Sequence, residues 1–339
     1  MRPVLGGLMV GRSLGGSVLT VQFPRWVGAS WGFLLVLSSV ATAQQYGEAR
    51  SLLVDAESSV DHTLLRWGVG ATGTPQSEVQ FGLLSATAGL GVSYQFAAGR
   101  SRWSLKAHME RGYVLGGQAR DSDYAIHLNG NEEYQVETSR IAAEVTGTDS
   151  WSTTVALGWN REFGARDPSS SFSLWLGWER AEQSVRMQHG TFVYLSYLAS
   201  LTDSTLPGLD SRYVGGWTGL WIAAEPHVRV ERADVSVRAA ITIAGHYDGM
   251  GTWNLRTNLA QPRSFEHEAN GHGYAVEVGL ARPLTGTLEA RVTGRYVRRF
   301  AGDGPEQVFL ADGTIRRNYR LREATFGTAG LALAIRKSF

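Results

Sequence analysis

Asp121 and Asp123 are the residues whose types and spacing best suit chemistry. They lie in a short polar stretch that follows two glycines, Gly116 and Gly117. Side chains two residues apart on an extended chain project to the same side, and two carboxylates that converge share a proton because like charges repel. Such a pair can hold and activate a water for attack on an amide. The alternative is an ordinary acidic loop tip.

The segments around this pair are predicted to be β-strands. Apolar residues alternate with small or polar ones over long stretches of the chain, and strict alternation of this kind indicates strands with one apolar and one polar face. The clearest stretches are 151–163, 172–178, 235–243, 274–280, 288–296 and 331–339.

Alternation alone does not say which face is inside. A soluble sandwich buries its apolar face, whereas a transmembrane β-barrel turns that face toward lipid and lines its interior with polar groups. Three further features favour the barrel. The first is at the N-terminus, where Arg25 precedes the apolar run 27–40 and the sequence Ala-Thr-Ala at 41–43. These are the parts of a cleaved signal peptide, and the run is shorter than the roughly 20 residues of a membrane-spanning helix.

The second feature is the rhythm of the connections, and the third is the last strand. Short turns near 99–101, 165–170, 232–234 and 284–286 alternate with long polar segments around 119–150, 189–211, 249–270 and 301–320. Periplasmic turns and extracellular loops produce this rhythm. The chain ends in an amphipathic strand with the aromatic residue Phe339, which is similar to the assembly signal of outer-membrane barrels.

We therefore predict two regions, a signal peptide at 1–43 and an all-β outer-membrane barrel at 44–339. The barrel is expected to be an antiparallel up-and-down barrel of about ten strands. The strands are placed near 62–73, 79–97, 102–118, 135–163, 171–188, 212–231, 233–248, 271–283, 287–300 and 322–339. An even number puts both termini on the periplasmic side, and a barrel of this size is filled mostly by side chains rather than by a wide pore. We expect a monomer in contact with outer-membrane lipid.

Composition excludes several other classes of function. The 32 Lys and Arg residues balance 31 Asp and Glu residues, so nucleic acid is not an expected partner. The absence of Cys excludes disulfides, thiol catalysis and cysteine metal sites. Four histidines fall on predicted loops and are interpreted as solvated side chains rather than zinc ligands, so no metal or other cofactor is predicted. They are His127, His189, His267 and His272.

Three stretches of the sequence resemble the omptins, a family of ten-stranded outer-membrane endopeptidases. Residues 121–124, Asp-Ser-Asp-Tyr, are similar to the D-x-D-W motif of the family, residues 177–194 to its fifth strand and the following loop, and residues 328–339 to its last strand. The resemblance covers roughly 79–339. It implies an extracellular site that cleaves a polypeptide near basic residues, in which an acidic pair faces an Asp/His pair across the barrel mouth.

The second half of that site departs from the family pattern. The positions that correspond without gaps to the D-x-H motif of omptins are Trp253 and Leu255, which cannot transfer protons. A shifted alignment offers His246 and Asp248, which alternation from Arg238 through Thr242 would place on the inward face. A neutral histidine oriented by a carboxylate could take a proton from water. The alternative is that His246 only lines the lumen.

The resemblance also implies an accessory glutamate on the first hairpin, for which Glu78 is the nearest candidate, and lipopolysaccharide as an activator. The lipid-binding segment of omptins, Y-x-E-x-R, corresponds here to residues 178–182, with the charge order reversed.

The register of the third strand bears directly on Asp121 and Asp123. Strict alternation from Trp103 through Met109 would turn both aspartates outward, unless a bulge near Gly112 or Gly116-Gly117 restores the inward direction.

Two functions follow from the sequence. The first is an omptin-like endopeptidase that uses Asp121, Asp123, His246 and Asp248 on a polypeptide substrate. The second is a related barrel without catalysis that acts as a surface structural, adhesion or binding protein. A histidine within hydrogen-bond reach of the acidic pair would distinguish the first from the second.

Overall fold

The computed structural model describes residues 51–71, 75–98, 101–129, 132–146, 148–163, 170–195 and 203–339. The predicted signal peptide at 1–43 lies outside these residues. The described chain is built from strands, joined by turns and short irregular connections. Among the described residues, no helix is long and apolar enough to cross a membrane.

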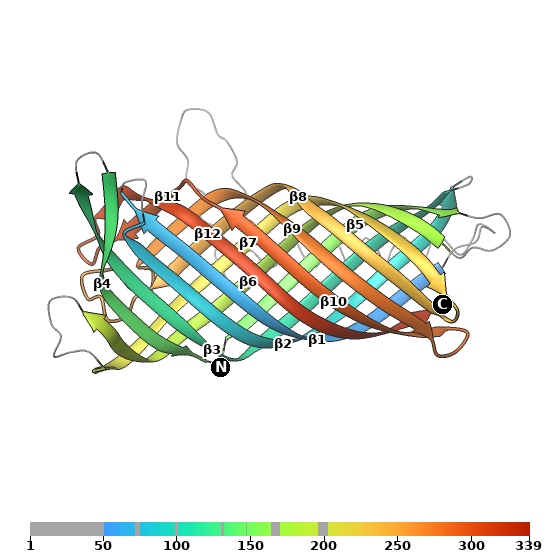
Figure 1. Ribbon diagram of the computed structural model, residues 1–339, viewed down its shortest axis with the longest axis horizontal. Coiled ribbons are helices and arrows are strands. Elements are labelled where there is room, and N and C mark those ends of the chain that lie inside the picture. Colours follow the sequence, from blue (N-terminus) through green and yellow to red (C-terminus); the bar gives the residue numbers. More distant parts are fainter. Residues whose placement is uncertain are drawn as a thin grey trace, which may run out of the picture.

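In the described part of the chain, twelve antiparallel strands form one closed barrel (Figure 1). Closure comes from the pairing of β1 with β12, which continues from Leu53 opposite Ser338 to Gly70 opposite Arg320. The strands are β1 (Ser51–Gly70), β2 (Ser77–Ala98), β3 (Ser101–Asn129), β4 (Glu132–Val145), β5 (Asp149–Phe163), β6 (Ser170–Leu195), β7 (Thr205–Val230), β8 (Ala233–Thr252), β9 (Phe265–Pro283), β10 (Leu288–Ala301), β11 (Gly304–Phe309) and β12 (Ile315–Ser338).

Ten strands surround the lumen at any height, as the sequence predicts. Both β4 and β5 pair with β3 on one side and with β6 on the other, so they act as one interrupted strand. In the same way, β10 and β11 both pair with β9 and β12. A closed ring leaves no sheet edge with unpaired N–H and C=O groups in hydrocarbon.

The apolar faces point outward, which confirms the barrel over the soluble sandwich. Alternate residues of the strands are exposed although they are large and apolar, as expected for a lipid-facing band. Examples from four strands are Leu174 and Leu176, Val237 and Ile241, Val278 and Leu280, and Leu331 and Leu333.

Several strand boundaries differ from the prediction. The first strand begins at Ser51 rather than near residue 62, and much of the predicted long polar loops consists of strand. Residues 119–129 extend β3 and 304–309 form β11, and the strand expected at 135–163 is divided into β4 and β5. Strands can continue beyond the lipid band without apolar outward residues because their outer face there meets water. The barrel is therefore taller than the apolar alternation indicates.

The lumen has two zones. In the extracellular half, buried apolar residues from strands all around the barrel form a continuous cluster. We call its six central rings the aromatic plug; they are Trp67, Phe81, Tyr213, Trp217, Tyr247 and Phe265. In the half that carries the lipid-facing band, the lumen is polar and encloses a cavity of about 510 Å³. The prediction of a lumen without a wide pore agrees with this filling.

Candidate functional site

The acidic pair, Asp121 and Asp123, faces the inside of the barrel because of a bulge in β3. Leu84 of β2 pairs with Gly116 of β3, but the next residue of β2 pairs with Val114, so Leu115 is left without a partner. Below the bulge the even-numbered residues of β3 point inward, and above it the odd-numbered residues do. The bulge lies beside Gly116-Gly117, one of the two places expected from the sequence.

Asp121 and Asp123 stand above the lipid-facing band, near the extracellular mouth. Asp121 lies opposite the fully buried Val79 on β2. Burial, together with the like charge of Asp123, raises the pKa of Asp121 to about 7, and the nearby Arg256 opposes this rise. Asp123 is more exposed and accepts a hydrogen bond of 3.2 Å from the Ser139 hydroxyl. The pair thus combines a carboxyl that titrates near neutral pH with an accessible carboxylate.

Arg256 occupies the space in front of the acidic pair. Its guanidinium Nη2 lies 3.4 Å from Oδ2 of Asp123. The residue belongs to the connection between β8 and β9, which folds into turns and is anchored by Trp253. The Trp253 ring packs edge-on against Phe265 at 5.0 Å and lies 6.1 Å from Trp67. Trp253 therefore anchors the connection that places the Arg256 guanidinium beside Asp123. The connection thus presents a cation to the aspartates and not a proton acceptor.

His246 and Asp248 do not face this site, so the prediction that they point inward is wrong. Leu220 of β7 pairs with Ala244, and the next residue pairs with Thr242, so a second bulge at Ile243 reverses the alternation in β8. Tyr247 consequently points into the plug and is fully buried. Its two neighbours lie on the outer wall, where the nearest acidic partner of His246 is Glu268 at 4.0 Å.

Asp248 is held by Arg180, a residue of the segment compared with the lipid-binding strand of omptins. Arg180 donates to both carboxylate oxygens of Asp248, at 2.7 and 3.2 Å, and to the Thr218 hydroxyl. The neighbouring Glu179 points inward, where Arg299 binds it at 3.0 Å. The one arginine of this segment is therefore already neutralised by a bidentate pair on the outer wall.

Glu78 also lies on the outer wall. Val79 beside it points inward and is fully buried, so Glu78 faces away from the lumen. Its carboxylate accepts a hydrogen bond of 2.7 Å from Arg66, which also binds Glu323 at 2.7 Å. The structure therefore places Glu78 in an ion-pair network between strands, on the opposite face of the sheet from the acidic pair.

A buried polar network lies among the rings of the plug, and the sequence does not predict it. His267 is not a solvated loop residue but a buried residue of β9, and its Nε2 lies 2.7 Å from the Tyr213 hydroxyl. The Tyr213 and Tyr247 hydroxyls also form a hydrogen bond. Glu306 of β11 pairs in register with His267, and burial raises its pKa to about 8. Both His267 and Glu306 keep a buried polar atom without a hydrogen-bond partner among the described residues.

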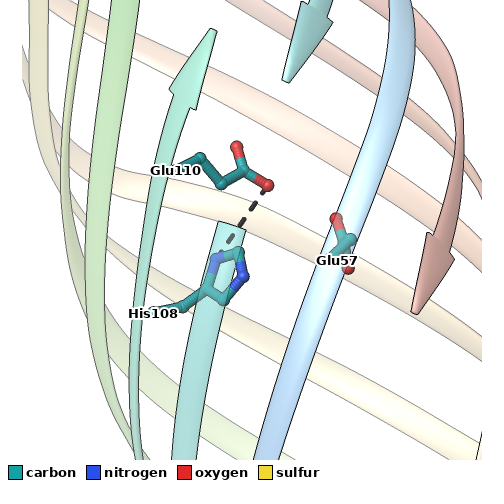
Figure 2. A group of neighbouring side chains, drawn as sticks. All are labelled: Glu57, His108 and Glu110. Atoms are coloured by element: carbon teal, nitrogen blue, oxygen red, sulfur yellow. Dashed lines mark ion pairs between the residues drawn. The ribbon is translucent and has the colours of Figure 1, made fainter. Parts of the chain in front are cut away.

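A further group of residues lies in the polar cavity, and the sequence analysis did not predict it. Glu57, His108 and Glu110 come together there on β1 and β3 (Figure 2). Alternation places each of them on the inward face, but it does not say which inward residues of different strands share a height in the barrel.

Structural comparison supports the barrel architecture. The outer membrane protease OmpT from Escherichia coli is similar with a TM-score of 0.65 at 13% identity, over 87% of this chain and 98% of that chain. The translocator domain of the autotransporter NalP from Neisseria meningitidis gives a TM-score of 0.37 at 13% identity, over 91% and 95% of the two chains. At 13% identity the likeness to OmpT concerns the fold alone, and the support for the barrel comes from that comparison. No curated protein matches the chain by sequence.

The family comparison places the protein more closely. The sequence model described as Pom, Protochlamydia outer membrane protein, matches residues 68–299. This stretch runs from the end of β1 to β10 and includes the acidic pair, every ring of the plug except Trp67, and most of the polar cavity. The protein is therefore a bacterial outer-membrane β-barrel that belongs to the Protochlamydia outer membrane protein family.

Proposed function

We propose that this barrel is a non-proteolytic surface protein that binds a cationic polypeptide segment at its extracellular mouth through Asp121 and Asp123. The observation that carries the proposal is the contact between Arg256 and Asp123. A guanidinium group is the chemical partner that a basic polypeptide would offer, and carboxylates bind guanidinium groups through charge-assisted hydrogen bonds. In this proposal, Arg256 fills the binding site in the absence of ligand, and the cationic segment of the partner polypeptide displaces it.

Exposure of the groups supports such an exchange. The side chains of Arg256 and Asp123 are 54% and 37% exposed, so both can be reached from outside. Exposed ion pairs of this kind contribute only about 0–1 kcal/mol. A peptide with several cationic side chains can therefore compete with the single internal arginine.

Among the described residues, no histidine contributes to the electrostatic surroundings of Asp121, which argues against an Asp/His site of the omptin kind. Activation of water requires a base within hydrogen-bond reach of the proton that it removes. In the described part of the chain, the charged groups that shift the pKa of Asp121 are Asp123 and Arg256, and neither is a histidine. His246 and Asp248 are on the far side of the sheet.

One observation favours an omptin-like endopeptidase as a second candidate. A carboxyl whose pKa is raised to about 7 can accept and donate a proton near neutral pH, and catalytic carboxyls are often tuned in this way. In this alternative, Asp121 acts as the base, a polypeptide segment displaces Arg256, and lipopolysaccharide serves as the activator.

Binding of a fluorescent, arginine-rich peptide to the folded barrel tests the proposal by anisotropy. We expect the Asp121→Asn/Asp123→Asn double variant to bind at least tenfold more weakly, and Arg256→Ala to bind more tightly. Arg263→Ala is the matched control because Arg263 lies in the same connection but pairs with Glu266 at 2.9 Å. Equal binding by the double variant and the unchanged protein would overturn the proposal.

Mass spectrometry of the same peptide, with and without lipopolysaccharide, separates the two candidates. We expect the peptide to stay intact in both conditions. Cleavage that the double aspartate variant abolishes would establish the endopeptidase instead.

A further inference from the structure

The polar cavity of the membrane-spanning half contains a cluster of side chains that suit a metal ion. Glu57 of β1 and His108 and Glu110 of β3 each offer one ligand atom, and these atoms all lie within 4.8 Å of one another (Figure 2). Lipid-facing residues such as Leu90 and Met109 surround the barrel at this height. We propose that Glu57, His108 and Glu110 bind a divalent transition-metal ion such as Zn²⁺ inside the barrel.

Two glycines of β2 create the space in which the three side chains meet. In the register of the sheet, Gly89 lies between Glu57 and Glu110, and Gly91 lies next to His108. A Cβ atom at Gly89 would lie 3.0 Å from both Glu110 Cγ and His108 Nε2. Any side chain at this position would fill the gap between β1 and β3, so the glycine keeps a cradle open where the ligands converge.

Glu57 and His108 are available for coordination. Most acidic side chains of the cavity are held closely by an arginine; the pairs are Asp55–Arg336 at 3.1 Å, Asp61–Arg295 at 2.8 Å, Glu179–Arg299 at 3.0 Å and Glu277–Arg238 at 2.6 Å. Among the described residues, the one ion-pair partner of Glu57 is Arg295 at 3.7 Å, and the ring of His108 approaches Glu110 at 3.9 Å. Neither forms a hydrogen bond with another described residue, which leaves their lone pairs free for a ligand.

Glu110 is fixed in place but keeps coordinating capacity. Its carboxylate accepts from Arg295 Nη1 at 2.8 Å and from the Ser152 hydroxyl at 3.2 Å. Arg295 itself remains anchored without Glu110, because it binds both carboxylate oxygens of Asp61 and the Ser59 hydroxyl. A metal ion therefore replaces one contact of Arg295 and neutralises the charge that Glu57 and Glu110 share.

The donor set determines the class of ion. One imidazole nitrogen and two carboxylate oxygens match the ligands of Zn²⁺ and related transition ions, whereas Ca²⁺ and Mg²⁺ prefer oxygen ligands alone. Ligands of a tetrahedral Zn²⁺ lie about 3.4 Å apart, so small side-chain rotations bring the three atoms into position. Water from the cavity would complete the coordination shell.

Ions can reach this position from the periplasmic end. The cavity that contains the cluster is also lined by Arg102 and Glu162, which lie beside the short turns and have side chains 61% and 42% exposed. Toward the extracellular end, the aromatic plug closes the lumen. The cluster is thus a periplasmic-facing site, separate from Asp121 and Asp123.

Zinc titration of the folded full-length protein without a histidine tag, in competition with a chromophoric chelator, tests this inference. We expect one high-affinity ion per barrel. Glu57→Gln and His108→Asn should each weaken binding by at least tenfold, because loss of a ligand leaves an incomplete site. In cobalt-loaded protein, His108→Asn should also change the visible absorption that reports nitrogen coordination.

Matched controls keep the result specific. Glu277→Gln removes a carboxylate of the same cavity that Arg238 already holds, and His227→Asn removes another lumen histidine, which lies 3.5 Å from Glu225. Both controls should bind zinc as the unchanged protein does, and heat-modifiable electrophoresis checks that every variant is folded. Absence of saturable binding, or equal weakening by the controls, would overturn the proposed site. Calcium binding that does not depend on His108 would also overturn it.

Discussion

Glu306 and His267 show how burial alters single residues in the extracellular half. Burial raises the pKa of Glu306 to about 8 and lowers that of His267 to about 3, so both are neutral inside the plug at neutral pH. Neutral side chains avoid the high cost of an unpaired charge among aromatic rings. The Tyr213 hydroxyl accordingly meets an uncharged imidazole.

From the raised pKa of Glu306 we predict how the stability of the folded barrel changes with pH. In the unfolded chain this carboxyl ionises near its ordinary value of 4.5, whereas in the barrel it keeps its proton until about pH 8. As pH rises, Glu306 therefore ionises in the unfolded chain before it does so in the barrel, which favours the unfolded state. The barrel loses stability as pH rises from 4.5 to 8. Glu306→Gln cannot ionise, so it should be more stable than the unchanged protein at pH 9 by about 5 kcal/mol, and nearly equal at pH 4.

Urea unfolding in lipid vesicles, followed by tryptophan fluorescence across this pH range, measures the difference. Glu268→Gln serves as the control because that side chain is 63% exposed, and it should show no such trend. A constant difference between Glu306→Gln and the unchanged protein at all pH values would contradict the assigned cause.

At the scale of the elements, the bulges in β3 and β8 decide which residues reach the lumen. Each inserts one unpaired residue, Leu115 or Ile243, and so reverses the side chains above it. The first bulge brings the acidic pair inward, and the second turns His246 and Asp248 outward. Each pair therefore lies on the face opposite to the one that strict alternation predicts.

Deletion of Leu115 should remove the first bulge and reverse the upper part of β3. Gln118 and Arg120 would then point into the plug, which should cost about 4 kcal/mol or more, because polar groups would be buried without partners. Leu115→Ala is the control: the side chain is 58% exposed on the outer wall, so its truncation should cost about 2 kcal/mol or less.

Urea unfolding compares the two variants, and the peptide-binding assay provides a second measurement. The deletion should also abolish peptide binding, while Leu115→Ala should retain it. If the two variants lose equal stability and both still bind, the bulge does not set the direction of Asp121 and Asp123.

At the scale of the whole molecule, the barrel is a tube closed at one end. The plug blocks the extracellular half, and the polar cavity opens toward the short turns. Trp67 is central to this closure because its ring contacts Tyr213, Trp253, Phe265 and His267 at centroid distances of 5.3 to 6.1 Å. A closed lumen of this kind suits binding at either end better than passage of solutes.

We expect the unchanged protein to show no stable ion conductance in planar bilayers. Trp67→Ala should open a conducting path and cost about 3–5 kcal/mol, as expected for removal of a buried aromatic ring. Trp178→Ala is the control because that ring faces outward and is 39% exposed. A stable open channel in the unchanged protein would contradict the closure of the lumen by the plug.

The sequence by itself determined the architecture. The two-residue period of apolar side chains, the alternating short and long connections and the count of ten strands predicted the closed barrel, because a sheet in lipid must turn one face outward and leave no free edge. The acidic pair could also be identified, together with the condition that a bulge near Gly112 or Gly116-Gly117 is needed for both aspartates to face inward. All of these inferences depend on local pattern.

Only the tertiary structure decided which residues meet inside the barrel. The bulge at Ile243 carries no clear local signal, yet it moves His246 and Asp248 to the outer wall. Arg256 reaches Asp123 through the fold of a connection 133 residues away in sequence. The meeting of Glu57 with His108 and Glu110 likewise depends on the stagger between β1, β2 and β3. Strand register and loop path are set by the whole closed sheet, so a local pattern of residues does not contain them.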